Sequence, residues 1–405
     1  MTKFCIIIMM HKKLRVGLFF GGRSVEHEVS VVSALQAYDN MDKDKYEVLP
    51  IYVDKSGHFF TGHKFLDIKN YKDVQSLLFS STQIVPANRN TGGFLKQGFL
   101  KKFEPIDVAF PLFHGSFGED GCVQGVFEIY GIPYTGLDVT GSAMAMDKIM
   151  SKALFKELGF NVGKYSWFTR RDWIAHSGKI LKQVQNDIKF PMFVKPGTGG
   201  SSIGAGRAKD LDSLQFAIEV ASAFSEKIII EEAFGDGIIE VNCSALGYRD
   251  IKASVCEQPV KSEELLSFSD KYMKGGKGKS GKNAGGMETL SRIIPADISK
   301  KLTAKIQEAS VKIFKALDGC GVARIDYFVD PKTEKFWVNE VNSPPGSLAF
   351  YLWEKSGIPY KELLDKLIEM ALDRAEERKK TTYVFESGLL EMMASGRGTG
   401  KKNSR

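Results

Sequence analysis

The residues best suited to chemistry lie towards the end of the chain, in the stretch GVARIDYFVDPKTEKFWVNEVN. Two runs rich in β-branched and aromatic residues flank a turn-forming Asp-Pro-Lys-Thr segment, which predicts an antiparallel hairpin. A turn centred on Thr333 pairs Arg324 with Asn342 and Asp326 with Glu340. Because side chains alternate along a strand, these four residues share one face. Carboxylate and amide oxygens suit hard cations, so this face predicts a Mg²⁺ site for phosphoryl chemistry.

The same alternation assigns the other side chains of this hairpin to its two faces. Phe328 and Val338 are expected beside the polar residues, whereas the opposite face is expected to carry Ile325, Tyr327, Val329, Trp337 and Val341. The loop Asn342-Ser343-Pro344-Pro345-Gly346 follows directly, and such a loop can aim backbone N–H groups at one point. A hairpin with a merely solvated polar face is the alternative interpretation.

A glycine-rich loop forms the second strong signal. The apolar run KFPMFVK ends in Lys195 and leads into PGTGGSSIGAG, which contains Ser201 and Ser202. Glycines allow backbone N–H groups to approach phosphate oxygens, and the adjacent lysine supplies positive charge. The order differs from GxxxxGK[ST], so this is no Walker loop. A flexible hairpin tip is the alternative, but beside a metal hairpin we favour phosphate binding.

Acidic residues within apolar strands suggest nucleotide contacts. The expected strand KIIIEEAF, residues 227–234, contains the adjacent acids Glu231 and Glu232, and Glu240 lies among apolar neighbours in GIIEVNCSALG. A buried carboxylate is costly without a partner. The ribose hydroxyls or the exocyclic amine of a nucleotide would satisfy such acids.

Three further polar positions each have an ordinary structural interpretation. Glu26 in the first turn of a helix normally compensates the helix dipole. His114 at the end of the apolar strand IDVAFPLFHG lies where open α/β sheets bind ligands, but it could simply hydrogen-bond the loop that follows. Lys148 and Lys152 are spaced i, i+4 on a helix, and two exposed lysines are the usual reading.

The elements that must position these residues alternate between strands and helices. RVGLFF predicts a buried strand, and SVEHEVSVVSALQAY predicts a helix with an apolar stripe of Val25, Val29 and Val32. SAMAMDKIMSKALFKELG predicts one continuous helix, and further helices are expected over LDSLQFAIEVASAFS, 298–317 and 360–378. The pattern indicates a mixed α/β and α+β fold whose N-terminal part is built on an open parallel sheet.

Composition sets the broad class. The chain has 405 residues, is 43% hydrophobic and 26% charged, and is long enough for two or three globular domains. Of its net charge of +7, residues 1–13 and residues 391–405 each contribute +3, so the body carries only +1 and gives no reason to invoke nucleic acid or a membrane. Five cysteines without CxxC spacing fit a reducing cytoplasm.

Taken together, eight stretches resemble the D-alanine:D-alanine ligases of the ATP-grasp superfamily, over roughly residues 14–380. They are GGRSVEHEVS, FHGSFGEDG, AMDKIMSK, FVKPGTGGSSIG, EEAF with Glu240, SDKY, ARIDYFVD and NEVNSPPGS, in this order. The resemblance implies an ATP-grasp architecture of three domains and suggests a homodimer. We divide the chain into an accessory extension (1–13), an N-terminal substrate domain (14–146), a central domain (147–236), a C-terminal catalytic domain (237–380) with a lid loop (262–290), and a disordered tail (381–405).

The resemblance also implies roles for individual residues. Lys148, Lys195 and Ser202 would contact the ATP phosphates, Glu231, Glu232 and Phe234 the adenine, and Glu240 the ribose. Asp326, Glu340 and Asn342 would hold two Mg²⁺ ions, for which Mn²⁺ could substitute. Glu26 would bind the ammonium of the first amino acid in a triad with Ser201 and Tyr272. Lys271 would reach the transferred phosphate, His114 would assist substrate binding, and Arg324 with the Gly346 N–H would form the oxyanion site.

The activity implied is phosphorylation of one D-alanine carboxylate by ATP, followed by attack of a second D-alanine amine, which yields D-alanyl-D-alanine for peptidoglycan synthesis. Tyr272 is neutral at physiological pH, which favours an amine over a hydroxyl nucleophile, because lactate-using relatives resemble this pattern with a lid histidine.

The sequence departs from the family pattern in three places. GGKGKSGKNAGG follows Tyr272, the residues around Thr198 lack a common charged pair, and Tyr351 and Leu352 stand where a Ser-Leu pair often binds the second substrate's carboxylate. A D-alanine:D-lactate or D-alanine:D-serine ligase, or another ATP-grasp carboxylate:amine ligase, is therefore the alternative. A catalytically idle ATP-binding regulator is a further one, which the intact set of Arg324, Asp326, Glu340 and Asn342 disfavours.

Overall fold

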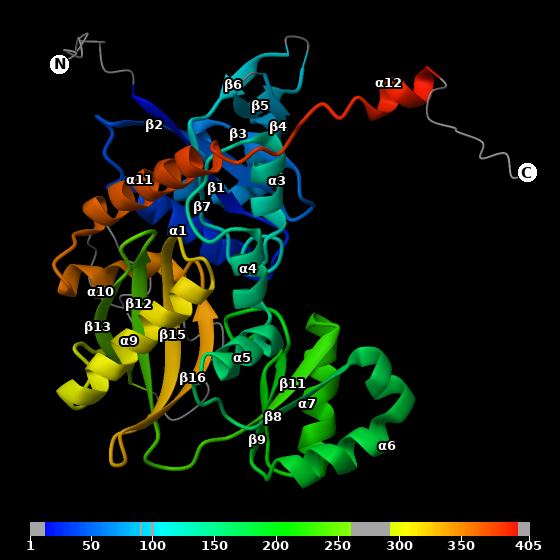
Figure 1. The fold of residues 1–405 in the computed structure, drawn as a ribbon, viewed down its shortest axis with the longest axis vertical. Coiled ribbons are helices and arrows are strands. Elements are labelled where there is room, and N and C mark those ends of the chain that lie inside the picture. The colour runs from blue at the N-terminus through cyan, green and yellow to red at the C-terminus, as the bar shows by residue number, and fades with distance from the viewer. Residues whose placement is uncertain (1–12, 90, 99–100, 261–291, 396–405) are drawn as a thin grey trace, which may run out of the picture.

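The computed structural model describes residues 13–89, 91–98, 101–260 and 292–395. In this part of the chain, the strands form a seven-stranded, a four-stranded and a five-stranded sheet. Figure 1 shows the seven-stranded sheet at one end of the molecule and the two smaller sheets side by side at the other. The predicted lid segment, residues 262–290 with Lys271 and Tyr272, lies outside the described residues.

The N-terminal sheet combines a parallel and an antiparallel part. Its strand order is β6-β5-β4-β3-β2-β1-β7, and β1 pairs in parallel with both β2 and β7. The strands are β1 (Leu14–Gly21), β2 (Tyr46–Val53), β3 (Phe59–Thr61), β4 (Thr82–Asn88), β5 (Gly92–Lys96), β6 (Phe103–Pro105) and β7 (Val108–Pro111). The parallel part is the sheet predicted from sequence. Strands β3 to β6 add antiparallel neighbours that the sequence pattern did not reveal, because they are short and weakly periodic.

The first helix packs through a different face than predicted. Helix α1 (His27–Asn40) buries Ser30, Val31, Ala34 and Ala37, whereas Val25 and Val32 are exposed and only Val29 of the predicted stripe is buried. The i, i+3, i+4, i+7 spacing of one helix face is that of the buried Ser30, Ser33, Ala34 and Ala37. Small residues occupy that face because α1 lies close against β1, so apolar side-chain size was a misleading guide here.

The predicted continuous helix at 142–159 is two helices. Helix α4 (Val139–Met146) ends at Asp147, whose extended backbone starts a new helix, α5 (Lys148–Glu157). The Asp147 carboxylate accepts hydrogen bonds from the backbone N–H groups of Ile149 and Met150, which is the role of an N-cap residue. An aspartate within a helical pattern therefore marked a helix start.

The four-stranded antiparallel sheet has the order β10-β9-β11-β8, with two helices on one side. Its elements are β8 (Tyr165–Thr169), α6 (Arg170–Asp187), β9 (Met192–Pro196), β10 (Gly206–Ala208), α7 (Leu211–Phe224) and β11 (Lys227–Glu232). Ile228 and Ile230 of β11 pack with Val194 and Ile218 in a separate hydrophobic core. Helix α7 confirms the predicted amphipathic helix, while β11 ends at Glu232 instead of Phe234.

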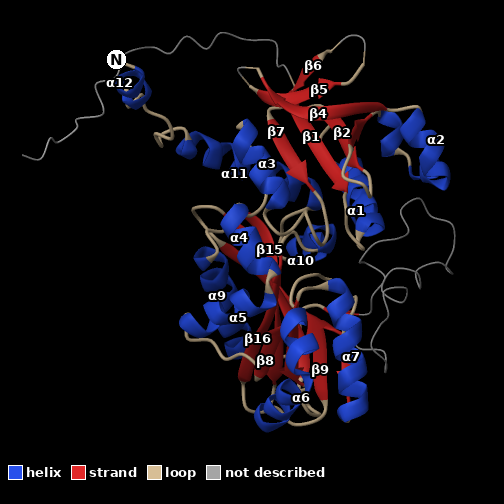
Figure 2. Ribbon diagram, turned by 90° about the vertical axis from the view of Figure 1, so that its right-hand side faces the viewer, coloured by secondary structure: helices blue, strands red, loops and turns tan. Residues whose placement is uncertain are grey.

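The five-stranded antiparallel sheet carries the predicted hairpin. Its order is β14-β13-β12-β15-β16, and its elements are β12 (Ile239–Gly247), β13 (Lys252–Pro259), β14 (Arg292–Ile293), α9 (Lys300–Ala316), β15 (Gly321–Asp330) and β16 (Lys335–Asn342). Helix α9 covers one face, where Ile306 and Ile313 meet Ile325 and Tyr327. Helices α10 (Phe350–Lys355) and α11 (Tyr360–Arg378) then join this sheet to α1 and β1 in one continuous core (Figure 2).

The remaining short elements lie in the N-terminal part and at the C-terminus. They are the 3₁₀ turns η1 (His63–Leu66) and η2 (Ile68–Asp73), helices α2 (Val74–Phe79) and α3 (Cys122–Tyr130), the 3₁₀ turn η4 (Gly346–Ala349) and helix α12 (Leu389–Ala394). None of the described helices is long and apolar enough to cross a membrane. The four cysteines in the described ranges are free thiols.

The hairpin register confirms the predicted pairing of the polar residues. Arg324 pairs with Asn342 and Asp326 with Glu340. A β-bulge then shifts the register, so Tyr327 pairs with Val338 and Phe328 with Trp337. The expected faces of Val338 and Trp337 were therefore wrong. Val338 is buried in the core with Tyr327, and the Trp337 ring lies 5.0 Å from that of Phe234.

The C-terminal segment protrudes from the body (Figures 1 and 2). It was expected to be disordered, yet α12 forms within it, and every side chain from 381 to 395 is exposed. Deletion of residues 386–405 should therefore change the melting temperature by no more than about 2 °C. Thermal unfolding measures this. Truncation after Met370, which removes the buried Ala371 and Arg374, is the contrasting variant and should melt clearly lower. A large loss of stability in the shorter deletion would contradict the independence of this segment.

Candidate active site

The polar face of the hairpin forms a compact charged network. The Arg324 guanidinium donates from Nε to Asp326 Oδ1 at 2.7 Å and from Nη2 to Asp326 Oδ2 at 2.8 Å. The side-chain amide of Asn342 donates to the same Oδ2 at 3.0 Å. Glu340 lies on the neighbouring strand, with its Oε2 3.6 Å from Lys148 Nζ. The predicted set is therefore assembled, and one arginine holds one of its two carboxylates in a bidentate pair.

The electrostatics of this face favour an additional positive charge. Burial raises the pKa of Asp326, the Arg324 charge opposes this, and the negative charge of Glu340 adds to the increase. For Glu340, burial is outweighed by Lys148 and Lys195, which lower its pKa. Two ionised carboxylates on adjacent strands repel each other, and a cation placed between them would relieve that repulsion.

A second charged group lies where the four-stranded sheet faces the hairpin. Glu231 is buried, and its carboxylate contacts Lys195 Nζ at 2.5 Å and Lys152 Nζ at 2.8 Å. Burial alone would raise the pKa of Glu231, but the two lysines hold it well below its usual range. For Lys195, burial is outweighed by Glu231 and Glu340, so its pKa is raised. Both groups therefore stay charged.

A cavity opens beside this ion group. Its lining residues are Phe193, Lys195, Glu231, Glu232, Phe234, Ile238 and Phe328. The rings of Phe234 and Phe328 lie 4.7 Å apart, and Glu232 accepts a hydrogen bond from the Lys164 N–H at 2.7 Å. An aromatic wall beside carboxylates and lysines suits a purine ring whose phosphates extend towards the lysines. Four of the predicted ATP contacts, Lys195, Glu231, Glu232 and Phe234, meet here.

Glu231 makes ion pairs that were not predicted from the sequence. Its carboxylate contacts two lysines, and its contact with adenine stays a prediction. Lys152 was interpreted from sequence as exposed, but its exposed fraction is 2%. The signal that could have revealed it was its position one helical turn after Lys148, facing a strand with adjacent acids. Glu240 lies on β12 and pairs with Phe328, which lines the same cavity.

The glycine-rich loop lies between this cavity and the N-terminal sheet. Lys148 Nζ donates to the Gly199 carbonyl at 2.6 Å, and the Lys148 N–H donates to the Gly197 carbonyl at 2.9 Å. Ser201 and Ser202 have positive φ angles of 51° and 58°, a left-handed conformation that turns the loop sharply. The loop is thereby fixed against the start of α5, and Lys148 lies between it and Glu340.

The Ser201 end of this loop reaches the N-terminal sheet. The Ser201 hydroxyl donates to Glu26 Oε1, whereas Glu26 Oε2 is buried and accepts no hydrogen bond within the described structure. Gly115 and Gly200 border this carboxylate, and a Cβ at either position would lie within 3 Å of Glu26 Oε2. The sequence thus leaves room around a buried acceptor, which is suited to an ammonium group. Glu26 lies at the N-cap position of α1, one residue before the predicted first turn.

His114 lies behind Glu26 in a buried polar group. Its Nε2 is 3.0 Å from the Ser33 hydroxyl and its Nδ1 is 3.9 Å from Glu119 Oε1. Burial alone would lower the pKa of His114, but Glu119 and Glu26 outweigh it and raise the pKa. Strand β7 ends at Pro111, so His114 belongs to the following loop and not to the strand. Glu119, which was not singled out from the sequence, also accepts the Gly115 N–H at 2.5 Å.

The residues after the hairpin form a tight, buried turn. Gly346 begins η4, in which Ser347, Leu348 and Ala349 have φ angles of 48°, 57° and 48°. Three successive left-handed residues are costly and persist only where packing holds them. Tyr351 follows in α10, and its hydroxyl donates to Glu257 at 2.8 Å. The Leu352 side chain is fully buried in the core, so the predicted contact of Leu352 with the substrate would have to come from its backbone.

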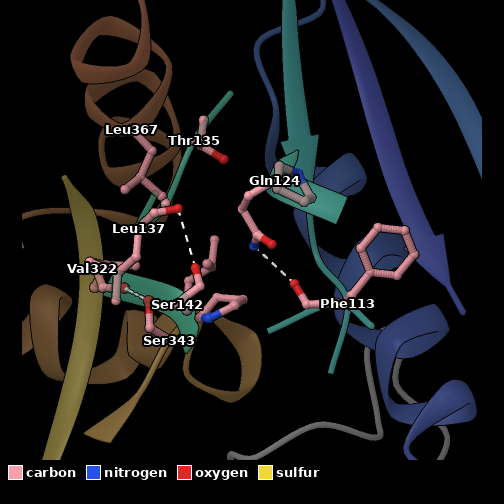
Figure 3. Close-up of a pocket in the computed structure, with 13 residues that line it drawn as sticks. Phe113, Gln124, Thr135, Leu137, Ser142, Val322, Ser343 and Leu367 are labelled. Carbon is pink, nitrogen blue, oxygen red and sulfur yellow. Dashed lines mark hydrogen bonds between the residues drawn. The ribbon is translucent and has the colours of Figure 1, made fainter. Parts of the chain in front are cut away.

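A further cavity borders the same loop (Figure 3). Pro344 and Leu348 line it from the C-terminal part, and Gln124 and Phe113 line it from the N-terminal part. Gln124 Nε2 donates to the Gly118 carbonyl at 2.9 Å, which fixes the loop after β7. The cavity therefore lies where the N-terminal and C-terminal parts of the molecule meet.

Comparison with known proteins agrees with this geometry. The family described as D-ala D-ala ligase N-terminus matches residues 15–137, and the one described as D-ala D-ala ligase C-terminus matches residues 154–369. The chain belongs to the D-alanine–D-alanine ligase family. This membership confirms the resemblance seen in the eight sequence stretches.

Individual relatives of this family cover nearly the whole chain. A D-alanine–D-alanine ligase of Thermosipho melanesiensis is 37% identical over 90% of this chain and 96% of its own length. One from Bacillus cytotoxicus is 36% identical over 92% of this chain and 99% of its own. Among solved structures, the VanG D-Ala:D-Ser ligase of Enterococcus faecalis has a TM-score of 0.74 at 29% identity, covering 89% of this chain and all of that one. The D-alanine-D-alanine ligase of Coxiella burnetii has a TM-score of 0.74 at 27% identity. The match covers 95% of this chain and 99% of that one. The mixed α/β fold is thus the ligase family's ATP-grasp fold.

Proposed function

We propose that this protein is an ATP-dependent ligase that joins two D-alanine molecules through a D-alanyl phosphate and so supplies D-alanyl-D-alanine for peptidoglycan synthesis. One observation carries this proposal. Arg324, Asp326, Glu340 and Asn342 converge on one face of a hairpin, opposite the buried lysines that flank an aromatic cavity. An ATP molecule with its base among Phe234 and Phe328 would direct its phosphates towards Lys195 and Lys148.

The oxygen donors of the hairpin fit Mg²⁺. Within the described ranges no three His, Cys, Asp or Glu side chains gather around one point. The candidate site has two carboxylates and the Asn342 amide, which suits a cation that takes its other ligands from phosphates and water. Among the described residues, Asp326 Oδ1 accepts a hydrogen bond only from the Arg324 Nε–H, so a carboxylate lone pair remains for a metal. Asp326, Glu340 and Asn342 would hold Mg²⁺, which would neutralise charge on the transferred phosphate.

The donor D-alanine is placed by the N-terminal groups. Its ammonium would bind the buried Glu26 Oε2, and Ser201 fixes the Glu26 carboxylate from the opposite side. Its carboxylate would then point towards the glycine-rich loop and the γ-phosphate. Holding the two reactants in this geometry converts a bimolecular step into an effectively unimolecular one.

The reaction then proceeds in two displacements. A carboxylate oxygen of the donor attacks the γ-phosphorus, the bond from that phosphorus to the bridging oxygen breaks, and ADP leaves. The neutral amine of the acceptor attacks the acyl carbon, forming the C–N bond and an oxyanion. Arg324 and the Gly346 N–H would stabilise this oxyanion. The C–O bond to phosphate then breaks, and phosphate departs with that oxygen and the surplus amine proton.

Tyr272 and Lys271 complete the proposal on sequence grounds alone, with the roles implied by the resemblance. A homodimer and a cytoplasmic location are proposed on the same basis. Because one similar structure is a D-Ala:D-Ser ligase, D-serine is the second candidate acceptor.

The test is ADP release from ATP with a panel of acceptors, combined with mass spectrometry of the product. D-Alanine alone should support ADP release and give the dipeptide, in preference to products from D-serine or D-lactate near neutral pH. Preferential formation of the D-lactate ester would contradict the proposed acceptor. Absence of any D-alanine-dependent ADP release would instead support the idle ATP-binding alternative.

Glu26→Gln should raise the KM of the donor D-alanine by roughly 10- to 100-fold, because a charged hydrogen bond to its ammonium is lost. The KM of ATP should change little. Glu28→Gln, on the exposed side of the same helix, is the matched control, since Glu28 pairs only with the exposed Lys55 among described residues. Initial rates over a range of D-alanine concentrations measure the effect. Equal donor KM values for Glu26→Gln and wild type would show that Glu26 does not bind the donor.

A further inference from the structure

A buried charged cluster lies on the five-stranded sheet, outside the metal, nucleotide and donor groups assigned above. It consists of Glu257 on β13, Arg292 on β14 and Tyr351 on α10, and we name it the Glu257 cluster. Glu257 has an exposed fraction of 1%, and its Oε1 accepts hydrogen bonds from Tyr351 at 2.8 Å and from Asn242 at 3.1 Å. The Arg292 guanidinium lies 4.0 Å from the centre of the Tyr351 ring and has its Nε 3.4 Å from Glu257 Oε2.

The strand register places this cluster at one end of the proposed catalytic face. Asn242 pairs with Glu257 on one side and with Asp326 on the other, and Asp326 pairs with Glu340. The row across the sheet is therefore Glu340, Asp326, Asn242 and Glu257. Adjacent strands lie about 4.8 Å apart, so the backbone at Glu257 is roughly 10 Å from that at Asp326. The nucleotide cavity is at the Glu340 end, and the Glu257 cluster is at the opposite end.

Core packing alone does not account for this cluster. Burying a carboxylate and a guanidinium costs several kcal/mol per ion unless their hydrogen bonds are satisfied. Glu257 Oε2 is buried and accepts no hydrogen bond within the described structure, since the Arg292 contact is longer than a good hydrogen bond. Stacking on Tyr351 fixes the plane of the Arg292 guanidinium, which is the arrangement that prepares a guanidinium for bidentate binding of a carboxylate.

A guanidinium at this end of the site would match the charge and shape of the acceptor's carboxylate. The acceptor must approach the acyl carbon from the side away from ATP, which leaves the part of the row beyond Asp326. The Arg324 guanidinium already donates from Nε and Nη2 to both carboxylate oxygens of Asp326. Its other N–H groups are assigned to the oxyanion, so it offers no second bidentate edge to the acceptor carboxylate. Within the described structure, Arg292 is the next guanidinium along the row, and its side chain is largely buried.

We propose that Arg292 binds the α-carboxylate of the acceptor D-alanine and that Glu257 and Tyr351 are positioning residues that fix its guanidinium. This inference rests on the proposed ligase function and deepens it. The substrate class of the acceptor site is a small molecule whose nucleophile is adjacent to a carboxylate. Amines that lack the carboxylate are poor acceptors, and Tyr351 acts through Arg292 instead of contacting the substrate as a serine would.

The wild-type enzyme provides the first test. D-Alanine and D-alaninamide are compared as acceptors, and hydroxylamine, which has no carboxylate, traps the acyl phosphate as a hydroxamate. We expect D-alanine to exceed D-alaninamide by about 30-fold or more in kcat/KM, which is the range for a charge-assisted contact. Equal use of the two acceptors would overturn the proposal without any variant.

Arg292→Gln supplies the second test, with Arg292→Lys as the variant that retains the charge. Arg292→Gln should raise the KM of acceptor D-alanine about 30-fold while the rate of hydroxamate formation and the donor KM stay within about two-fold of wild type. Arg292→Lys should recover part of the acceptor affinity. Tyr351→Phe keeps the stacked ring and should have a smaller effect. Arg249→Gln, which removes an arginine from a surface ion pair with Asp373 and Glu377, is the matched control.

A purely structural role of Arg292 predicts a different pattern. The rate of hydroxamate formation and the melting temperature would then fall, and both KM values would rise. This result would overturn the assignment. An unchanged acceptor KM in Arg292→Gln would do the same. Failure of the ligase proposal itself is distinguishable, because the wild type would then form no D-alanine-dependent hydroxamate at all.

Discussion

Replacement of Glu340 by glutamine should lower kcat by roughly two to three orders of magnitude, equivalent to about 3–4 kcal/mol of transition-state stabilisation. Glutamine keeps the size of the side chain but removes one negative ligand for Mg²⁺. It also removes the negative charge that offsets Lys148, since Glu340 Oε2 lies 3.6 Å from Lys148 Nζ. The fold should be retained, because Glu340 is only partly buried and lies on the polar face of β16.

Two measurements separate this effect from loss of structure. The Mg²⁺ concentration for half-maximal rate should rise in Glu340→Gln, whereas the melting temperature should stay close to that of wild type. Glu334→Gln, in the exposed turn of the same hairpin, is the matched control and should retain normal turnover. Wild-type turnover in Glu340→Gln would eliminate the proposed metal site on this face.

Arg324→Lys is expected to reduce kcat by a similar factor, about 10²- to 10³-fold, which is the loss typical of removing one oxyanion donor. The planar guanidinium bonds both oxygens of Asp326 at 2.7 and 2.8 Å, and a lysine ammonium cannot reproduce that fork. Lysine does keep the positive charge, so Asp326 is not left as an uncompensated buried anion. A neutral residue at this position would leave Asp326 unpaired and lower the stability of the fold as well as kcat, so the two effects could not be separated.

The diagnostic for Arg324 is a fall in kcat at nearly constant KM for ATP. The Arg249→Lys variant tests the same substitution on the surface, where Arg249 pairs with Asp373 and Glu377. Dipeptide formation under saturating D-alanine and ATP gives kcat directly. A kcat within three-fold of wild type in Arg324→Lys would show that Arg324 does not stabilise the transition state.

The part of the site that rests on local periodicity could be predicted from sequence. Alternation along two strands and one turn is sufficient to pair Arg324 with Asn342 and Asp326 with Glu340, and the structure has those pairs. The prediction failed one residue later. A bulge changes the register without a clear compositional signal, so Val338 entered the core and Trp337 turned towards the nucleotide cavity.

The contacts that depend on tertiary structure could not be predicted from sequence. Lys152 and Glu231 are 79 positions apart, and only the packing of α5 against the sheets brings them into contact. Glu257 likewise lies in a strand that carries no motif, and its significance appears only when Asn242 places it in line with Asp326. Helix α1 packs against β1 largely through small buried residues and not through the larger valines of the predicted stripe, because the helix lies close to β1.

The most direct test of the central claim follows the oxygen atoms. The enzyme is supplied with ATP, Mg²⁺ and D-alanine whose carboxylate carries ¹⁸O, and the released phosphate is analysed by mass spectrometry. An acyl phosphate mechanism transfers one carboxylate oxygen to phosphorus, so the phosphate should contain one ¹⁸O for each dipeptide formed. Release of unlabelled phosphate with the dipeptide, or formation of AMP and pyrophosphate, would contradict the mechanism built on Arg324, Asp326, Glu340 and Asn342.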